Sequence, residues 1–440
     1  MRGISLFLRH RFRALIRLLL PPVPLQPGEL WLLVVLSGAM FVGVYDLTLN
    51  SLALKHVQIS LGMHDADVGR YAALMRLGVL PAMLLALASD VYGRRRMLMI
   101  SIVGVILSSL ATSLVSTPEG FASAQFCARI FIAAEDFLTI VILVEVLRPA
   151  LRGWGLGAFG AMGALGGGFA AALFAFIEVV PGGWRTLYVI GVIPMIGIAW
   201  YRRSIPETGR FVAQRAVRGA PNALDVWRPL VALFRDYPGR LLVMASIAGP
   251  FGFSFVPATF FMSKFMQDNL GLSPGEVSFM FIMTAGVPLM GNVVAGSFSD
   301  AYGRRRTMVA GILLAAIGAF LLYSTTIVWV AVAGWIIMLF AYLGVDILIG
   351  AMGAELFPTS YRSTASAARA IVVVVAAAAG FYCESLLFPI AGGHAGAILS
   401  LLLAAPIGGL VAWRFLVEAA TRDLEVVSPE RRTMMVPEAR

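Results

Sequence analysis

Long apolar runs separated by short polar segments fill most of the 440-residue chain. A helix that crosses a membrane needs roughly 20 predominantly apolar residues, and twelve runs of that kind can be placed along the sequence. A transmembrane β-barrel would instead show strands of ~10 residues with alternating polarity, and no such pattern is found. The sequence therefore predicts an all-α polytopic membrane protein. The expected spans are residues 29–53, 66–89, 97–115, 119–147, 153–177, 184–201, 240–263, 275–298, 307–325, 328–353, 364–388 and 394–417.

The second half of the chain repeats features of the first at a constant offset of 210 residues. The clearest repeat is a short polar segment with one Asp, one Gly and three Arg between two apolar runs. Gly permits the backbone reversal of a tight turn, and arginines hold such a loop on one side of a membrane. Several landmarks at one offset indicate an internal duplication. The repeated features are 89–96 with 299–306, Asp136 with Asp346, Glu145 with Glu355, and Arg152 with Arg362.

The duplication divides the chain into two bundles of six helices joined by a basic linker. The linker contains several arginines and prolines but no apolar run long enough to span a membrane. Before the first span, arginines alternate with Leu, Ile and Phe, which favours a basic amphipathic helix on the membrane surface. The expected domains are an amphipathic segment at 1–28, bundles at 29–201 and 240–417, a cytoplasmic linker at 202–239 and a cytoplasmic tail at 418–440.

Composition agrees with a membrane protein and gives its orientation. The chain is 59% hydrophobic and only 13% charged, so a soluble fold would have too little polar surface to cover itself. The net charge of +10 comes mainly from arginines in alternate loops, the linker and the termini. This positive-inside pattern places both termini in the cytoplasm and argues for contact with membrane lipids instead of nucleic acid. The preference for Arg over Lys favours a bacterial protein, hence one of the inner (plasma) membrane.

Metal, cofactor and enzyme chemistry find no support in the residues. Cys127 and Cys383 both lie in apolar runs, and the four histidines are scattered, so no metal-ligand spacing or disulfide framework arises. We find no activated nucleophile and no phosphate-binding loop. We therefore expect no metal, no cofactor and no enzymatic activity.

The repeated loops carry a recognisable motif. Each contains Asp-x-x-Gly-Arg-Arg and follows the second span of its half, and with two six-helix halves and a central basic loop this pattern resembles the major facilitator superfamily. Glu355-Leu356-Phe357-Pro358-Thr359 and Pro206-Glu207-Thr208 resemble segments of its sugar-porter and organic-ion:proton symporter branches. The resemblance implies a monomeric secondary transporter in which two pseudo-symmetric bundles rock around a site at the membrane midplane.

The same resemblance implies a gate on the cytoplasmic side. In those branches the charged residues of these segments form a network that latches the outward-facing state. Acidic residues add nothing to a positive-inside signal, so carboxylates beside the arginines favour a gate over a purely topological role. The expected gate residues are Asp90, Gly93, Arg94, Glu145, Arg152 and Glu207 in the first half, and Asp300, Gly303, Arg304, Glu355 and Arg362 in the second.

Ionisable residues inside the expected spans are candidates for function because a charge at membrane depth is costly. A rise of about 1.5 Å per residue places Asp46, Arg76 and Arg129 at a common depth. A carboxyl that alternates between a dry cavity and an arginine neighbour can load and release a proton. Proton-coupled relatives pair an Asp of the first helix with an Arg of the fourth. Asp46 matches the Asp, whereas Arg129 lies one turn from the usual place, which Gln125 occupies. The proton-coupling candidates are Asp46, Glu135, Asp136 and Asp346, with static ion pairs as the alternative.

The expected substrate is a small organic anion or an amphiphilic metabolite with an apolar body. Sugar porters line their site with Gln and Asn, which are rare in these spans, and residues 251–261 are apolar and aromatic instead. There a sugar would leave hydroxyls unpaired at about 1–3 kcal/mol each. The substrate-binding candidates are Arg76, Arg129, Phe253, Phe255, Asn292 and Asp346.

Proton symport is favoured over two alternatives. Drug/proton antiporters carry Gly-Pro-x-x-Gly-Gly in the fifth helix, and here Ala164 stands where Pro belongs. Proton-coupled efflux of a drug or metabolite remains an alternative. A membrane nutrient sensor that transports nothing is a more distant one, since such proteins usually add a long cytoplasmic signalling extension.

Overall fold

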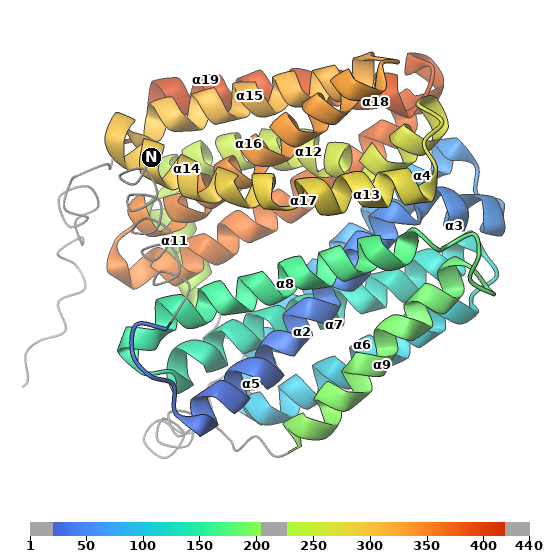
Figure 1. Cartoon of the computed structure of the whole chain (residues 1–440). Coiled ribbons are helices and arrows are strands. Elements are labelled where there is room, and N and C mark those ends of the chain that lie inside the picture. The colour runs from blue at the N-terminus through green and yellow to red at the C-terminus, as the bar shows by residue number, and fades with distance from the viewer. Residues whose placement is uncertain (1–20, 204–226, 419–440) are drawn as a thin grey trace, which may run out of the picture.

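The computed structural model describes residues 21–203 and 227–418. These residues form two helical bundles, which Figure 1 shows one above the other. The amphipathic segment expected before residue 21, most of the linker and the tail beyond residue 418 lie outside the described residues. The first bundle comprises α2 (Pro27–Leu52), α4 (Asp65–Leu77), α5 (Val79–Tyr92), α6 (Arg94–Leu114), α7 (Pro118–Val146), α8 (Arg152–Phe174) and α9 (Trp184–Arg202).

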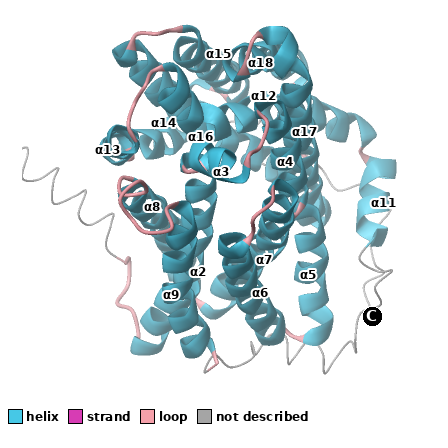
Figure 2. Ribbon diagram, turned by 90° about the vertical axis from the view of Figure 1, so that its right-hand side faces the viewer, coloured by secondary structure: helices cyan, strands magenta, loops and turns pink. Residues whose placement is uncertain are grey.

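The second bundle repeats this order. It comprises α12 (Pro238–Asn269), α13 (Pro274–Thr284), α14 (Gly286–Tyr302), α15 (Arg304–Ser324), α16 (Val328–Glu355), α17 (Arg362–Ala391), α18 (His394–Leu401) and α19 (Ala405–Phe415). Short helices complete the described chain: α3 (Leu54–Leu61), α11 (Trp227–Asp236) and the 3-10 turns Pro149–Leu151, Thr359–Tyr361 and Leu402–Ala404. Figure 2 shows α11 at the edge of the molecule, where it packs against α17 and α12.

The prediction of an all-α polytopic fold is confirmed. Ten segments of the described chain are long and apolar enough to cross a membrane. Two more complete the twelve: α7, which carries several charged residues, and the split span formed by α13 and α14. The second, eighth and twelfth spans are each built from two helices instead of one. The protein is therefore a multi-pass integral membrane protein with six spans in each half.

Close helix packing within each bundle depends on glycine. A Cβ on Gly166 of α8 would lie 1.9 Å from the carbonyl oxygen of Phe41 in α2, and one on Gly380 of α17 would lie 2.2 Å from that of Phe253 in α12. Only a residue without a side chain permits such an approach of two helix backbones. These contacts fix α2 against α8 and α12 against α17, the helices that frame the centre of the molecule.

The two halves meet through a limited set of helices. α4 packs against α17, α8 packs against α13, and α2 and α3 reach α12. α3 and α4 of the first bundle lie near the right-hand edge of Figure 1. We call this end of the bundles the opposite end, because it is distant along the helices from the loops at Gly93 and Gly303. We call the end that carries those two loops the arginine end.

Candidate solute-binding site and gates

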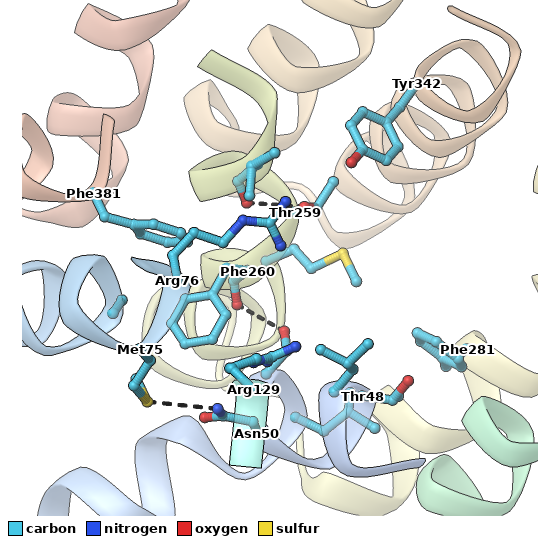
Figure 3. A pocket seen from close by; sticks show the side chains of 16 residues that line it. Thr48, Asn50, Met75, Arg76, Arg129, Thr259, Phe260, Phe281, Tyr342 and Phe381 are labelled. Atoms are coloured by element: carbon cyan, nitrogen blue, oxygen red, sulfur yellow. Dashed lines mark hydrogen bonds between the residues drawn. The ribbon is translucent and has the colours of Figure 1, made fainter. Parts of the chain in front are cut away.

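A central cavity of ≈ 250 Å³ lies between the two halves. α2, α4 and α7 line it from the first bundle, and α12, α13, α16 and α17 line it from the second. Figure 3 shows the lining side chains converging from both halves. The lining residues are Leu47, Thr48, Asn50, Ser51, Leu52, Ala72, Met75, Arg76, Arg129, Val256, Thr259, Phe260, Met262, Phe281, Tyr342 and Phe381.

Two of the candidate residues, Arg76 and Arg129, line this cavity. Arg76 comes from α4 and Arg129 from α7, and both appear in the same part of the cavity in Figure 3. Among the described residues, the Nε of Arg76 has no hydrogen-bond partner. The remaining lining groups are apolar side chains, hydroxyls, one amide and a tyrosine. The cavity is therefore lined by two partly buried cations, and its other lining groups are neutral.

The break in the second span positions one of these cations. Gly78 separates α4 from α5, and a Cβ on it would lie 2.5 Å from the Phe126 carbonyl oxygen and 2.9 Å from the Cβ of Arg129. The chain at Gly78 thus packs directly on α7 beside Arg129, and any larger residue would push the two helices apart.

Gln125, which stands where the relatives carry an arginine, belongs to a neutral polar network. Its Oε1 accepts a hydrogen bond from Asn50 Nδ2 at 2.9 Å, and its Nε2 donates to Thr112 Oγ1 at 3.3 Å. The same Asn50 nitrogen lies 3.7 Å from the Met75 sulfur. Gln125 is fully buried, so it ties α7 to α2 and α6 directly behind the cavity wall.

The candidate carboxylates Asp46, Asp136 and Asp346 do not line the cavity but act electrostatically on its arginines. Asp46 is 2% exposed, and neither of its oxygens has a hydrogen-bond partner among the described residues. Arg129 is the charged group that acts most strongly on Asp46. Asp136 also acts on Arg129. Asp346 of the second half interacts with Arg76 of the first, and with Arg369 of its own half.

Glu135 lies in a different environment. It forms a buried ion pair with Arg202, whose guanidinium also approaches the carbonyl oxygen of Leu36 at 3.4 Å. Arg202 is fully buried although it stands at the last residue of α9, beside the basic linker. Sequence reasoning missed Arg202 because it reads as one more linker arginine. The pair joins α7, α9 and α2 and is a static contact in this conformation.

Three further candidate residues, all proposed to bind substrate, also lie outside the lining. Phe255 is fully buried and packs on Phe251 with ring centroids 5.2 Å apart. Phe253 is partly buried within the core of the second half, and Asn292 of α14 has a buried Oδ1 without a partner among the described residues. α12, which carries Phe253 and Phe255, lines the cavity with Val256, Thr259 and Phe260 instead.

At the arginine end, the candidate gate residues pair within their own halves. Arg94 forms an ion pair with Glu145 in the first half. Arg304 pairs with Glu355 at 3.0 Å and with Asp300 at 2.6 Å in the second. Gly93 and Gly303 have φ of 102° and 97°, values that favour glycine. Both precede a helix whose first residue is the paired arginine.

Four gate candidates remain. Arg152 donates from Nε to the Leu147 carbonyl oxygen at 3.3 Å, and Arg362 is the first residue of α17. The side chain of Asp90 and the whole of Glu207 lie outside the described residues.

Glu418 is a charged residue of the arginine end that sequence reasoning missed. Its carboxylate accepts hydrogen bonds from the backbone N–H groups of Arg304 at 2.7 Å and Arg305 at 3.2 Å, at the N-terminus of α15. A Cβ on Gly303 would lie 2.6 Å from this carboxylate. The 210-residue offset relates Glu207 to position 417, one residue away, so the duplication itself carried the signal.

The opposite end holds a row of charges that joins the halves. We call it the outer ladder and define it as Lys55, Asp268, Lys264, Asp65, Glu384 and His394. Lys55 lies 2.9 Å from Asp268, and Lys264 bridges Asp268 at 2.7 Å and Asp65 at 3.0 Å. His394 bridges Asp65 at 3.3 Å and Glu384 at 2.6 Å. Lys55 and Asp65 belong to the first half and the other four to the second.

Further hydrogen bonds support the ladder across the same junction. Ser51 donates to the Phe260 carbonyl oxygen at 2.8 Å, and Lys55 donates to that of Gln267 at 3.1 Å. Ser385 donates to the carbonyl oxygen of Ala66. The halves are thus held together at the opposite end by direct polar contacts.

Twelve spans in two related halves around a central cavity define a transport protein of the membrane. The chain belongs to the Major Facilitator Superfamily, whose family model matches residues 30–265 and 251–437. It is 22% identical to the cis,cis-muconate transport protein of Acinetobacter baylyi over 74% of this chain and 80% of that one. It is 30% identical to a puromycin resistance protein of Streptomyces alboniger over 42% and 38%. A solved D-xylose-proton symporter shares the fold with a TM-score of 0.70 and 19% identity, over 89% and 98% of the two chains.

Proposed function

We propose that this protein takes up a small organic anion with an apolar body across the bacterial inner membrane, by proton symport. The observation that carries the proposal is the pair Arg76 and Arg129 in a ≈ 250 Å³ cavity whose other walls are neutral. The muconate relative supports an organic anion as solute.

The arginines favour an anion on energetic grounds. A partly buried charge is unfavourable unless it is fully compensated, and a carboxylate can accept two parallel hydrogen bonds from one guanidinium. The apolar lining from Val256, Phe260 and Phe381 suits the body of such a solute. A sugar would satisfy few of its hydroxyls in this lining, and a cationic drug would meet two positive charges.

Asp46 supplies a mechanism for coupling. While it is ionised, its charge competes with the solute for Arg129. A proton on Asp46 removes that competitor and leaves Arg129 to bind the anion, so proton and solute bind together. When the solute leaves, Arg129 again stabilises the ionised form of Asp46, and the proton follows. Asp346 and Arg76 form a second pair of interacting carboxylate and arginine, and this pair joins the halves. Asp136 is a further carboxylate that acts on Arg129. Glu135 is the least favoured proton carrier, because it already forms an ion pair with Arg202.

The charge asymmetry orients the protein. Positive loops lie on the cytoplasmic side, which assigns the arginine end and both termini to the cytoplasm and the opposite end to the outside. The direct polar contacts described between the halves lie at the outer end, so the conformation is closed to the outside. The ion pairs of Arg94 and Arg304 belong to the cytoplasmic gate, and a monomer bounded by lipid suffices for the whole cycle.

Efflux is the second candidate function. The match to a puromycin resistance protein favours it, as do the glycines at 163 and 166–168 of α8. The two arginines of the cavity favour an anion over a cationic drug in either direction, so the direction of coupled proton movement is what separates the candidates.

Purified protein in liposomes tests the proposal. Small organic acids, aromatic acids and cationic drugs are added outside, and the external pH is recorded. Alkalinisation evoked by an organic acid, together with uphill accumulation of that acid, supports proton symport. Acidification evoked by a drug identifies an exporter, and a solute that moves without any proton movement contradicts the coupling.

A further inference from the structure

His394 occupies a special position in the outer ladder. Its Nδ1 lies 2.6 Å from Glu384 in its own half, and its Nε2 lies 3.3 Å from Asp65 in the other half. The ring stacks on Phe261, with centroids 4.6 Å apart and planes at 26°, and it also contacts Phe388 at 4.6 Å. The imidazole is therefore held rigidly between two carboxylates that belong to different halves.

Glu384 is the most deeply buried member of the ladder. Its side chain is 0% exposed, and among the described residues its Oε2 has no hydrogen-bond partner. Gly69 of the first half packs against it so closely that a Cβ there would lie 2.5 Å from Oε2 and 2.4 Å from the Phe381 carbonyl oxygen. Closure of the halves is thus what removes water from Glu384, because α4 covers it.

The charges of the ladder do not balance unless one more proton is bound. Asp65, Asp268 and Glu384 carry three negative charges, whereas Lys55 and Lys264 carry two positive charges. Two further titratable groups lie near the ladder among the described residues. Tyr323 of α15 donates its hydroxyl hydrogen bond to the Ala258 carbonyl oxygen, and burial lowers the pKa of His56, which interacts with Lys55 and Asp268, and so favours its neutral form. One proton shared by His394 and Glu384 restores neutrality, and an unbalanced charge in a partly buried cluster is costly.

We propose that Glu384 and His394 form a proton-binding site of the outer gate, distinct from Asp46, which takes up one proton when the halves close over it. The proton belongs to the pair and not to one residue, as expected for coupled groups. In the open gate, water reaches both groups and the additional proton is no longer required. Acid on the outer side therefore favours the closed gate.

The expected size of the effect follows from linkage. If closure takes up one proton, the ratio of closed to open protein changes by at most about tenfold per pH unit. The change should fall at weakly acidic to neutral pH, about 5 to 8, where an imidazole and a carboxyl that interact can bind one proton as a pair. This inference rests on alternating access as assumed in the proposed function, but it needs neither a particular solute nor proton symport.

Distances across the outer gate provide the test. Spin labels are attached to cysteines at Ile59 and Ile390, which are 70% and 81% exposed on different halves. The native Cys127 and Cys383 are replaced by Ala, and distance distributions are recorded by double electron–electron resonance in lipid nanodiscs from pH 5 to 8.5. With the wild-type ladder and no solute present, the distribution of label-to-label distances should shift towards shorter distances as the pH falls.

Three variants sharpen the result. His394→Gln should remove the pH dependence between about pH 6 and 8. Glu384→Gln balances the ladder without an additional proton, and should keep the gate closed throughout this range. Arg70→Gln is the matched control, because Arg70 lies at the same end but pairs with Asp67 of its own half at 3.0 Å, and this variant should show the wild-type pH dependence.

Two outcomes would overturn the proposal: a wild-type distribution that does not change with pH, or a His394→Gln protein that keeps the wild-type pH dependence. Should His394→Gln fail to fold, Glu384→Gln decides alone, since wild-type titration of that variant also contradicts the site. Liposome transport is measured on the same preparations. A gate that titrates in a protein without proton-coupled uptake supports this site and refutes the proposed symport, and the reverse result does the opposite.

Discussion

The two ends of the molecule differ in whether their ion pairs lie within one half or join the two halves. At the arginine end, the two ion pairs of the repeated motif each lie within one half and are counterparts of one another: Arg94 with Glu145, and Arg304 with Glu355. At the opposite end, the outer ladder joins the halves, and the 210-residue offset relates none of its charged members to another charged residue. Duplication copies what a half needs for its own fold. Contacts between the halves must instead be complementary, so the two copies had to diverge there.

The largest expected effect comes from fixing the end that joins the halves. Ala66→Cys with Ser385→Cys, in a chain lacking Cys127 and Cys383, places two thiols where a hydrogen bond now joins α4 to α17. Oxidation should form a disulfide and abolish transport, because the outer gate can no longer open, and a reductant should restore it. Liposome uptake before and after oxidation measures this. The Ala66→Cys single variant is the control, and full activity of the oxidised double variant would mean that this end does not separate during transport.

The second prediction concerns the centre, which lies between the two ends. Asp46→Asn keeps the size of the side chain but holds it in the neutral state, so Arg129 stays available to the solute while no proton can be released. Proton-driven accumulation should be lost, at least tenfold below the wild type, while exchange of solute across the membrane continues. Uptake of labelled solute with and without a pH gradient distinguishes these activities. Unchanged uphill uptake would exclude Asp46 as the proton carrier, and Asp136→Asn and Asp346→Asn would then be tested in the same assay.

Sequence reasoning was most informative for features that lie within one half of the molecule. The motif at Gly93 and Gly303 could be predicted because the duplication shows it twice and the arginines mark a membrane surface. Helix rise alone predicted that Arg76 and Arg129 share a depth, and both line the cavity. The twelve spans followed from apolar length. The breaks at Gly78 and Ala285 were missed, although each lies three residues before a proline, Pro81 or Pro288, that cannot donate a helical hydrogen bond.

Rotation of helices and contacts between halves could not be predicted in the same way. Residues 251–261 are apolar on all sides, so their pattern does not indicate which face meets the cavity. Val256, Thr259 and Phe260, at helical spacing, line it in place of Phe253 and Phe255. His394 lies far from Asp65 in sequence, and nothing local to either residue signals the other. The packing of α4 on α17, which in turn packs on α18, brings them together.

The third prediction tests whether the arginine end acts on the rate of transport rather than on binding. Arg94→Ala removes the ion pair with Glu145 and should lower the maximal uptake rate about tenfold, the equivalent of ~1.4 kcal/mol. The apparent affinity for the solute should change little, since the cavity is distant. Uptake kinetics at a fixed pH measure both quantities. A large loss of affinity with an unchanged maximal rate would contradict a gate role.

The fourth prediction concerns recognition in the cavity. Arg129→Lys keeps the positive charge but loses the planar guanidinium, which can donate two parallel hydrogen bonds to a carboxylate. The affinity for an anionic solute should fall roughly tenfold, or about 1.4 kcal/mol. Arg185→Lys, at a residue that contacts Ser60 and the Val115 carbonyl oxygen at the opposite end, is the matched control and should bind normally. Equal affinity in Arg129→Lys and the wild type would make Arg129 a structural residue.

The smallest expected effect comes from Glu418, and it tests whether a charge at the arginine end acts only within its own half. Glu418→Gln keeps an acceptor oxygen near the backbone N–H groups of Arg304 and Arg305 but removes the negative charge at the N-terminus of α15. A charge of this kind stabilises a helix terminus by about 0.3–1 kcal/mol, so the melting temperature of the purified protein should fall by a few degrees at most. Glu178→Gln, at an exposed residue of the opposite end, should melt like the wild type. Because Glu418 caps a helix of its own half, the pH dependence of the outer gate should not change. If it did change, the two ends would be coupled through α15, and the separation of their roles would have to be abandoned.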